Sequence, residues 1–183
     1  MPVVRFQELP DDARVWVFAS DRPLTGADAN QLLGAVDGFL AQWKAHGAPL
    51  RSAREWRDDH FLAIGVDPTA EQASGCSIDG LFRGLRELER DLNTSLVAGG
   101  RVFYRSDRGA VAKAARKDVP TLFQQGAIVE TTPVFDTSIT DAAAYRARFE
   151  RPARDSWVAS LVSAQASQPS SRSATNASSA RKG

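Results

Sequence analysis

The stretch from His60 to Leu92, HFLAIGVDPTAEQASGCSIDGLFRGLRELERDL, organises our interpretation of the whole sequence. It begins with an apolar run that is typical of a buried strand, followed by an Asp-Pro turn and a polar loop. Apolar residues then recur at helical spacing, at Ile78, Leu81, Phe82, Leu85, Leu88 and Leu92. The pattern predicts a strand, a loop and an amphipathic helix that begins at Ser77 or Ile78 and packs on a sheet.

Two further strands and another helix are expected before this stretch. RVWVFA, residues 14–19, has two apolar faces and suits a central strand, and a helix should follow from about Thr25 to His46. Residues 50–57 alternate between apolar and charged positions and should form a hairpin with residues 60–66 through Asp58 and Asp59.

A fourth strand is predicted after the second helix, over residues 101–105, RVFYR. The order of elements is then β-α-β-β-α-β, which is the order of ferredoxin-like domains. We therefore predict an α+β fold, a single domain with a ferredoxin-like core. Its C-terminal extension should contain an edge strand that includes Pro133 and a helix that begins after Thr140.

Length and composition predict one globular domain and a separate tail. The chain has 183 residues, of which 43% are hydrophobic and 25% charged, so it is long enough to bury its own core. Residues 163–183 are rich in Ser and Ala and contain neither acidic nor aromatic residues. We expect the domain over residues 1–162 and a disordered tail over residues 163–183.

Charge and cysteine content restrict the compartment and the partners. The formal net charge is +1, so no overall field favours nucleic acid or an anionic membrane as a partner. A single Cys cannot form an intramolecular disulfide, which favours a reducing, cytoplasmic compartment. The sequence shows neither a signal peptide nor an apolar run of the roughly 20 residues that a membrane span needs, so we expect a soluble protein.

The lone Cys76 suggests a thiol hypothesis, because it lies at the expected start of the second helix, where unpaired N–H groups lower thiol pKa values. A base (His46 or His60) and an orienting carboxylate (Asp79 or Asp67) would complete a small thiol-dependent enzyme or a redox-responsive protein. The alternative is structural. Cys then fills a gap beside the helix, Asp79 complements the helix dipole, and His46 caps the preceding helix.

Several site classes are not supported by the motifs. The sequence contains no G-x-x-x-x-G-K-[ST] phosphate loop, no G-x-S-x-G and no H-E-x-x-H. Two separate His and one Cys have no metal-ligand spacing, so we predict neither a metal nor a cofactor. The chain is not a P-loop ATPase, and whether it is an enzyme at all stays open.

Protein binding is the first functional hypothesis. Trp56 stands beside Arg54 and Arg57, and Trp and Arg dominate the energetics of protein interfaces. We expect a non-catalytic module that binds a protein partner or self-associates through its sheet or an edge strand. RNA binding is the third hypothesis, after thiol chemistry, because Phe103 and Tyr104 lie among basic residues, although a solvated face explains the same pattern.

Several strings resemble a family of small bacterial cytoplasmic proteins whose members often carry the label "ABC transporter ATPase". The resemblance covers roughly residues 3 to 161 and rests on RVWVF, WKAHGAPL, FLAIGVD, ASGCSID, PVFD and DSW, of which GCSID is the most distinctive. The phosphate loop and the signature L-S-G-G-Q of ABC ATPases are both missing. The family has no established catalytic residues, so the resemblance implies one intact domain with an added tail and no particular chemistry.

Overall fold

The structure is a computed structural model that describes residues 3–69, 73–97 and 99–166. It confirms the α+β class, with helices and small antiparallel sheets. The last helix, α5 (Val158–Ala166), continues four residues into the segment that we predicted as a tail, and the rest of that segment lies outside the described residues. No helix within the described ranges combines the length and the apolar character that crossing a membrane requires.

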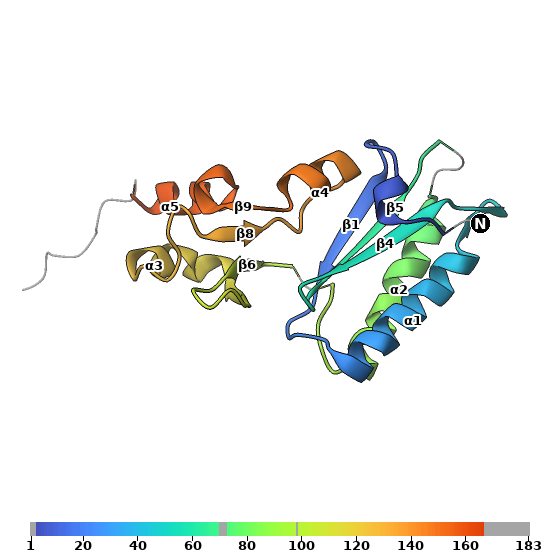
Figure 1. Cartoon of the computed structure of the whole chain (residues 1–183), viewed down its shortest axis with the longest axis horizontal. Helices are drawn as coiled ribbons and strands as arrows, with labels where there is room; N and C mark the ends of the chain where they lie inside the picture. The colour runs from blue at the N-terminus through green and yellow to red at the C-terminus, as the bar shows by residue number, and fades with distance from the viewer. Residues whose placement is uncertain (1–2, 70–72, 98, 167–183) are drawn as a thin grey trace, which may run out of the picture.

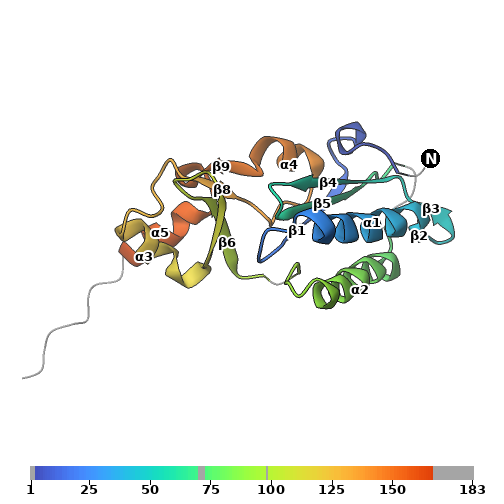
Figure 2. The same ribbon diagram turned by 60° about the horizontal axis from the view of Figure 1, so that its bottom comes forward.

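The first sheet has three antiparallel strands in the order β1 (Arg14–Ala19), β5 (Phe61–Val66) and β4 (Ser52–Arg57). Helices α1 (Gly26–Gln42) and α2 (Gly75–Asp91) cover one face of it (Figures 1 and 2). The sequence explains the order. FLAIGV is apolar throughout and is buried in the centre, whereas SAREWR carries charges and lies at an edge. The predicted hairpin between these two strands is confirmed.

The two helices present apolar stripes to the sheet and are joined at one end. Helix α2 begins at Gly75, two residues before the earliest predicted start, because the hydroxyl of Ser74 caps it and accepts the N–H of Ser77. The indole of Trp43 donates to the carbonyl of Ser77 at 2.9 Å and so ties the end of α1 to the start of α2. The buried positions of the two helices are Leu32, Val36, Leu40, Leu81 and Leu85.

The second sheet has four antiparallel strands in the order β7 (Val111–Ala115), β6 (Arg101–Arg105), β8 (Pro133–Phe135) and β9 (Glu150–Pro152). It lies beside the first sheet in both views (Figures 1 and 2). The remaining elements of the described chain are α3 (Val119–Gln124), α4 (Ala142–Arg148), the two-residue strands β2 (Lys44–Ala45) and β3 (Ala48–Pro49), which form a small hairpin near α2, and 3-10 helices over Phe6–Glu8, Arg116–Asp118 and Ala153–Asp155.

The ferredoxin-like arrangement is not confirmed. The order β1-β5-β4 is the one expected for the first three strands, but the predicted fourth strand, β6, does not join β1. It pairs with β7 through a tight hairpin and with β8 on its other side. The expectation that Pro133 marks an edge strand is wrong, since β8 lies between β6 and β9. Pro133 is tolerated there because it is the first residue of its strand.

The two sheets share one core. Phe61, the first residue of β5, is fully buried. Its ring centre lies 5.5 Å from that of Phe103 on β6, 4.5 Å from that of Phe135 on β8 and 5.1 Å from that of Phe149 at the end of α4. These four rings, the Phe61 cluster, join the face of the first sheet opposite α1 and α2 to the second sheet.

Replacing Phe61 tests this connection. We expect Phe61→Ala to lower the free energy of unfolding by about 3–5 kcal/mol, because the variant loses a large buried side chain and leaves a cavity between the sheets. Val129→Ala is the control, since Val129 is 46% exposed and should change stability by no more than about 0.5 kcal/mol. Urea unfolding measures both. A loss below about 1 kcal/mol in Phe61→Ala would contradict a shared core.

Candidate functional site: the open edge of strand β1

Strand β1 lies at an edge of the first sheet, and among the described residues loops bond to its outer side near its two ends. Near its start, the N–H of Val15 donates to the carbonyl of Thr140 at 2.8 Å. At its end, the N–H of Ala19 donates to the carbonyl of Leu96 at 3.2 Å. The middle of the edge lies between these two contacts.

Val17 occupies that middle position and leaves both backbone polar groups open. In an antiparallel ladder the direction of N–H and C=O alternates from residue to residue. Those of Val17 therefore point away from β5, as the N–H groups of Val15 and Ala19 do. Within the described part of the chain, no group beyond this sheet forms a hydrogen bond with the Val17 backbone. An edge strand with such open groups is a template for a further strand.

A groove of about 300 Å³ follows this edge and has apolar walls on both sides of it. On the side of the helices, Phe82 and Val97 line the groove and belong to the core beneath α1 and α2. On the opposite side the groove is lined by Phe103, a member of the Phe61 cluster, and by Ile139, together with the polar residues Thr137, Ser138 and Thr140. An extended chain would thus find backbone partners on the floor and an apolar wall for each of its alternating side chains.

The charges at the two ends of the groove differ. Arg101, at one end, pairs with Asp21 at 2.9 Å. The guanidinium carbon of Arg14, at the other end, lies 4.7 Å from the centre of the Trp16 ring. Among the residues that the structure describes, Arg14 has no carboxylate partner. Among the described residues, the groove therefore has apolar side chains at its centre and, at the β1 start, a cation without a carboxylate partner.

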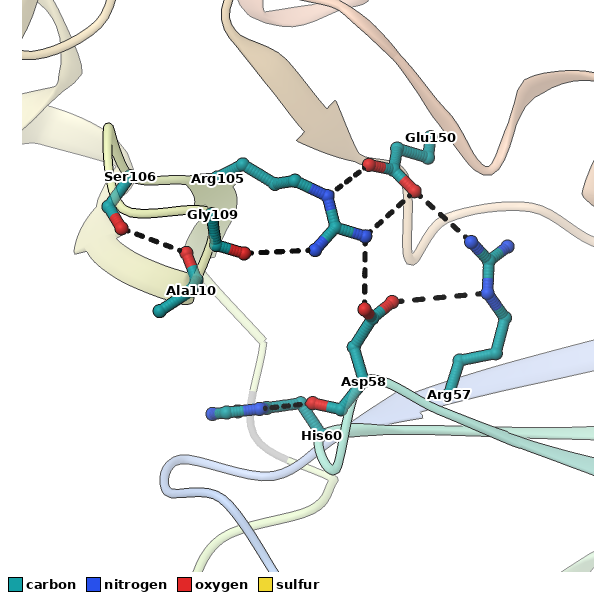
Figure 3. A network of polar contacts seen from close by, with 8 residues as sticks. All are labelled: Arg57, Asp58, His60, Arg105, Ser106, Gly109, Ala110 and Glu150. Carbon is teal, nitrogen blue, oxygen red and sulfur yellow. Dashed lines mark hydrogen bonds and ion pairs between the residues drawn. The ribbon is translucent and has the colours of Figure 1, made fainter.

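A network of ion pairs holds the second sheet beside the groove (Figure 3). Arg105 on β6 donates to Glu150 on β9 and, at 3.0 Å, to Asp58 in the β4–β5 turn. Arg57 donates to the same Glu150 at 3.1 Å. The hydrogen bond to Glu150 and the contact with Asp58 raise the pKa of Arg105 above its ordinary value. Two cations meet two anions here, so the network is internally neutralised and connects the β4–β5 turn to β6 and β9.

The residues of the thiol hypothesis lie at one end of the first sheet but do not contact one another. Cys76 is exposed in the first turn of α2, and Asp79 is exposed further along the same helix. His46 is exposed in the β2–β3 turn. The described side chains include no hydrogen bond or ion pair among these three, and no group of three His, Cys, Asp or Glu residues suited to a metal. The alternative base, His60, is buried with Nδ1 2.8 Å from the carbonyl of Asp58.

The residues of the predicted protein surface have partners inside the chain. Arg54 forms a two-fold hydrogen bond with Asp37 of α1, at 2.6 and 2.7 Å, and Arg57 belongs to the network of Figure 3. Trp56 is partly buried and packs against the core beneath the helices. Both arginines therefore serve as internal ion-pair partners, and the Trp56 ring is only partly available to another protein.

Sequence reasoning missed the groove. The prediction that RVWVFA forms a central strand is wrong, since β1 lies at an edge of its sheet, although both of its faces are covered. The property that matters is the edge at Val17. That edge depends on which strand pairs with β1, and no local pattern specifies it. Arg14 was the only available signal, as a cation at the start of an otherwise apolar strand.

Amide hydrogen exchange tests the open edge directly. The amides of Trp16 and Phe18 point toward β5, and those of Val15 and Ala19 bond to the flanking loops. We expect the Val17 amide to exchange at least about 100-fold faster than these four neighbours, because it alone among the five lacks a hydrogen-bond partner within the described residues. Equal protection along residues 15–19 would show that the edge is already covered.

The ion-pair network has its own test. Glu150→Gln removes the carboxylate that accepts from both Arg57 and Arg105, and we expect a loss of about 1–2 kcal/mol in the free energy of unfolding. Glu8→Gln is the matched control, since Glu8 pairs with the largely exposed Arg5, and solvent screening leaves such surface pairs with little effect on stability. If both variants lose the same stability in urea unfolding, the network does not connect the sheets.

Comparisons with known proteins were made against family models, curated proteins and solved structures, and none of them gives a match. They leave the resemblance to the small bacterial family as a prediction.

Proposed function

We propose that this chain is a non-catalytic protein-binding module that takes an extended segment of a partner as an additional strand on the outer edge of β1. The observation that carries the proposal is that the N–H and C=O of Val17 have no partner outside the sheet among the described residues, on the floor of a groove with apolar side chains on both sides. An added strand would exchange both hydrogen bonds with Val17. It would also occupy the position that a fourth strand takes in a ferredoxin-like sheet.

The magnitudes favour a weak, transient contact. Two backbone hydrogen bonds contribute about 1 kcal/mol each, and two apolar side chains about 1.5–3 kcal/mol each on burial. Association costs at least about 4 kcal/mol in lost freedom of motion. These magnitudes leave a net gain of about 1–4 kcal/mol, so the groove alone supports dissociation constants of about 1 mM or weaker, and tighter binding needs contacts outside it.

Two other functions receive less support from the same region. RNA binding needs several unpaired cations, but Asp21 neutralises Arg101 and also contacts Lys113 at 3.4 Å. Thiol chemistry has an exposed Cys76, yet no described base contacts it. A free, exposed thiol fits the reducing compartment that the sequence predicts.

Substitutions at Val17 distinguish binding through backbone hydrogen bonds from nonspecific hydrophobic binding. Val17→Pro removes the outward N–H and places a ring in the groove, while the ladder to β5 keeps its hydrogen bonds because that N–H points away from it. Val17→Ala is the matched control, which shortens the side chain but keeps the N–H. The probes are peptides selected on the wild-type protein from display libraries that present random heptamers either internally or at a free chain end.

We expect selected peptides to shift the amide signals of Val17 and of the groove walls in NMR spectra. Val17→Pro should weaken their binding at least about tenfold, and Val17→Ala less than about threefold. Urea unfolding of both variants verifies that the fold persists. Binders whose shifts lie elsewhere, affinities that Val17→Pro leaves unchanged, or the recovery of no binders from either library would each contradict the proposal.

A further inference from the structure

The open part of the β1 edge is short, and its ends are closed. The positions opposite Val15 and Ala19 are already occupied by Thr140 and Leu96, which leaves room only opposite residues 16–18. A partner chain that continued in the plane of the sheet would meet a loop at each end. An internal segment of a partner would have to bend out of the plane of the sheet at both ends of the gap, whereas a chain that terminates in the groove bends out at one end only. The length of the gap therefore favours a chain terminus over an internal segment.

The charges select the terminus and its direction. Arg14 and Trp16 both line the β1 start of the groove, where the Arg14 guanidinium stacks over the Trp16 ring. A carboxylate placed there would pair with Arg14, whereas an α-amino group would be repelled by it. In an antiparallel arrangement the incoming chain ends at the β1 start, next to Arg14. At the other end Arg101 is already neutralised by Asp21.

The walls define the side chains of the terminus. The residue opposite Val17 would direct its side chain to the face of Phe103 and Ile139, since cross-strand neighbours share a face. The last residue, opposite Trp16, and the residue opposite Phe18 would direct theirs toward Phe82 and Val97. All three positions therefore suit apolar side chains. Residues 167–183 contain no Val, Leu, Ile, Met or aromatic residue, so this segment does not supply the occupant.

We propose that the groove binds the last three residues of a partner protein, antiparallel to β1, with three apolar side chains and the free α-carboxylate against Arg14. This inference rests on the proposed function and specifies its ligand. In this arrangement Val17 binds the backbone of the partner segment, the two walls of the groove contact its side chains, and Arg14 pairs with its terminal carboxylate. Stacking on Trp16 holds the guanidinium at that end before any ligand arrives.

Defined peptides test the role of the carboxylate. The probes are eight hexapeptides, acetyl-Ser-Gly-Ser followed by Val or Leu at each of the last three positions, each made with a free carboxylate and as the amide. Dissociation constants are measured by fluorescence of the tryptophans and checked by NMR shifts at Val17. For the best-binding sequences, we expect the free acid to bind about fivefold tighter than its amide, with the difference shrinking in high salt.

Arg14→Gln should remove the difference between acid and amide and leave the affinity of the amide unchanged. Arg14 has no ion pair within the described structure and loses only its contact with the Trp16 ring, so urea unfolding of the variant should show a small loss of stability and a fold that persists. Arg108→Gln is the control for net charge, because Arg108 is exposed in the β6–β7 turn and does not line the groove. It should keep the preference for the free acid.

The outcomes separate this inference from the proposed function. Equal binding of acid and amide at Val17 would overturn the role of the chain end and leave strand addition intact. A second result would also overturn the role of the chain end and leave strand addition intact. In that result none of the hexapeptides binds, but internally displayed segments do bind, and Val17→Pro abolishes their binding. If Arg14→Gln kept the preference for the free acid, the assignment to Arg14 would be wrong. Absence of any Val17-dependent binder would overturn both proposals.

Discussion

The burial of Phe61 between the two sheets is the interaction on which the rest of the structure depends. Its ring fills the space where β5, β6, β8 and the end of α4 meet. Two guanidinium groups close this cluster, since Arg57 lies over the ring of Phe149 and Arg105 over that of Phe135, each at 5.0 Å. The same two arginines carry the ion pairs with Asp58 and Glu150 (Figure 3). One set of side chains thus covers the rings and neutralises the charges between the sheets.

This shared core explains why the edge of β1 is open. Because Phe103 points into the Phe61 cluster and β6 is paired on both sides, β6 cannot serve as the fourth strand beside β1. The loops that lead into and out of the second sheet then cross the two ends of that edge, at Leu96 and Thr140. An open edge is a liability that folds usually cover. Here the cover stops short of Val17, and Phe103 forms a wall of the remaining space.

The elements with local patterns could be predicted from the sequence, and the pairing between distant segments could not. The β4–β5 hairpin follows from alternation around Asp58 and Asp59, which both adopt the left-handed conformation that such turns need. The start of α2 was placed slightly late, since Gly75 is a poor helix former and hides the cap at Ser74. The partner of β6 depends on contacts of Phe103 with residues more than thirty positions away in the sequence, which periodicity does not reveal.

The candidate site was hidden for a related reason. Trp56 and its neighbouring arginines attract attention by residue type, yet Asp37 and Glu150 already neutralise the arginines. The groove depends instead on the backbone of Val17, and a backbone group has no signature in the sequence. The near-neutral composition also does not show which charged side chains are free to bind a ligand, because that depends on which ion pairs form in the folded structure. Around the groove Asp21 pairs with Arg101, whereas Arg14 has no carboxylate partner among the described residues, so local pairing leaves a nearly neutral chain with a cation that can select a ligand.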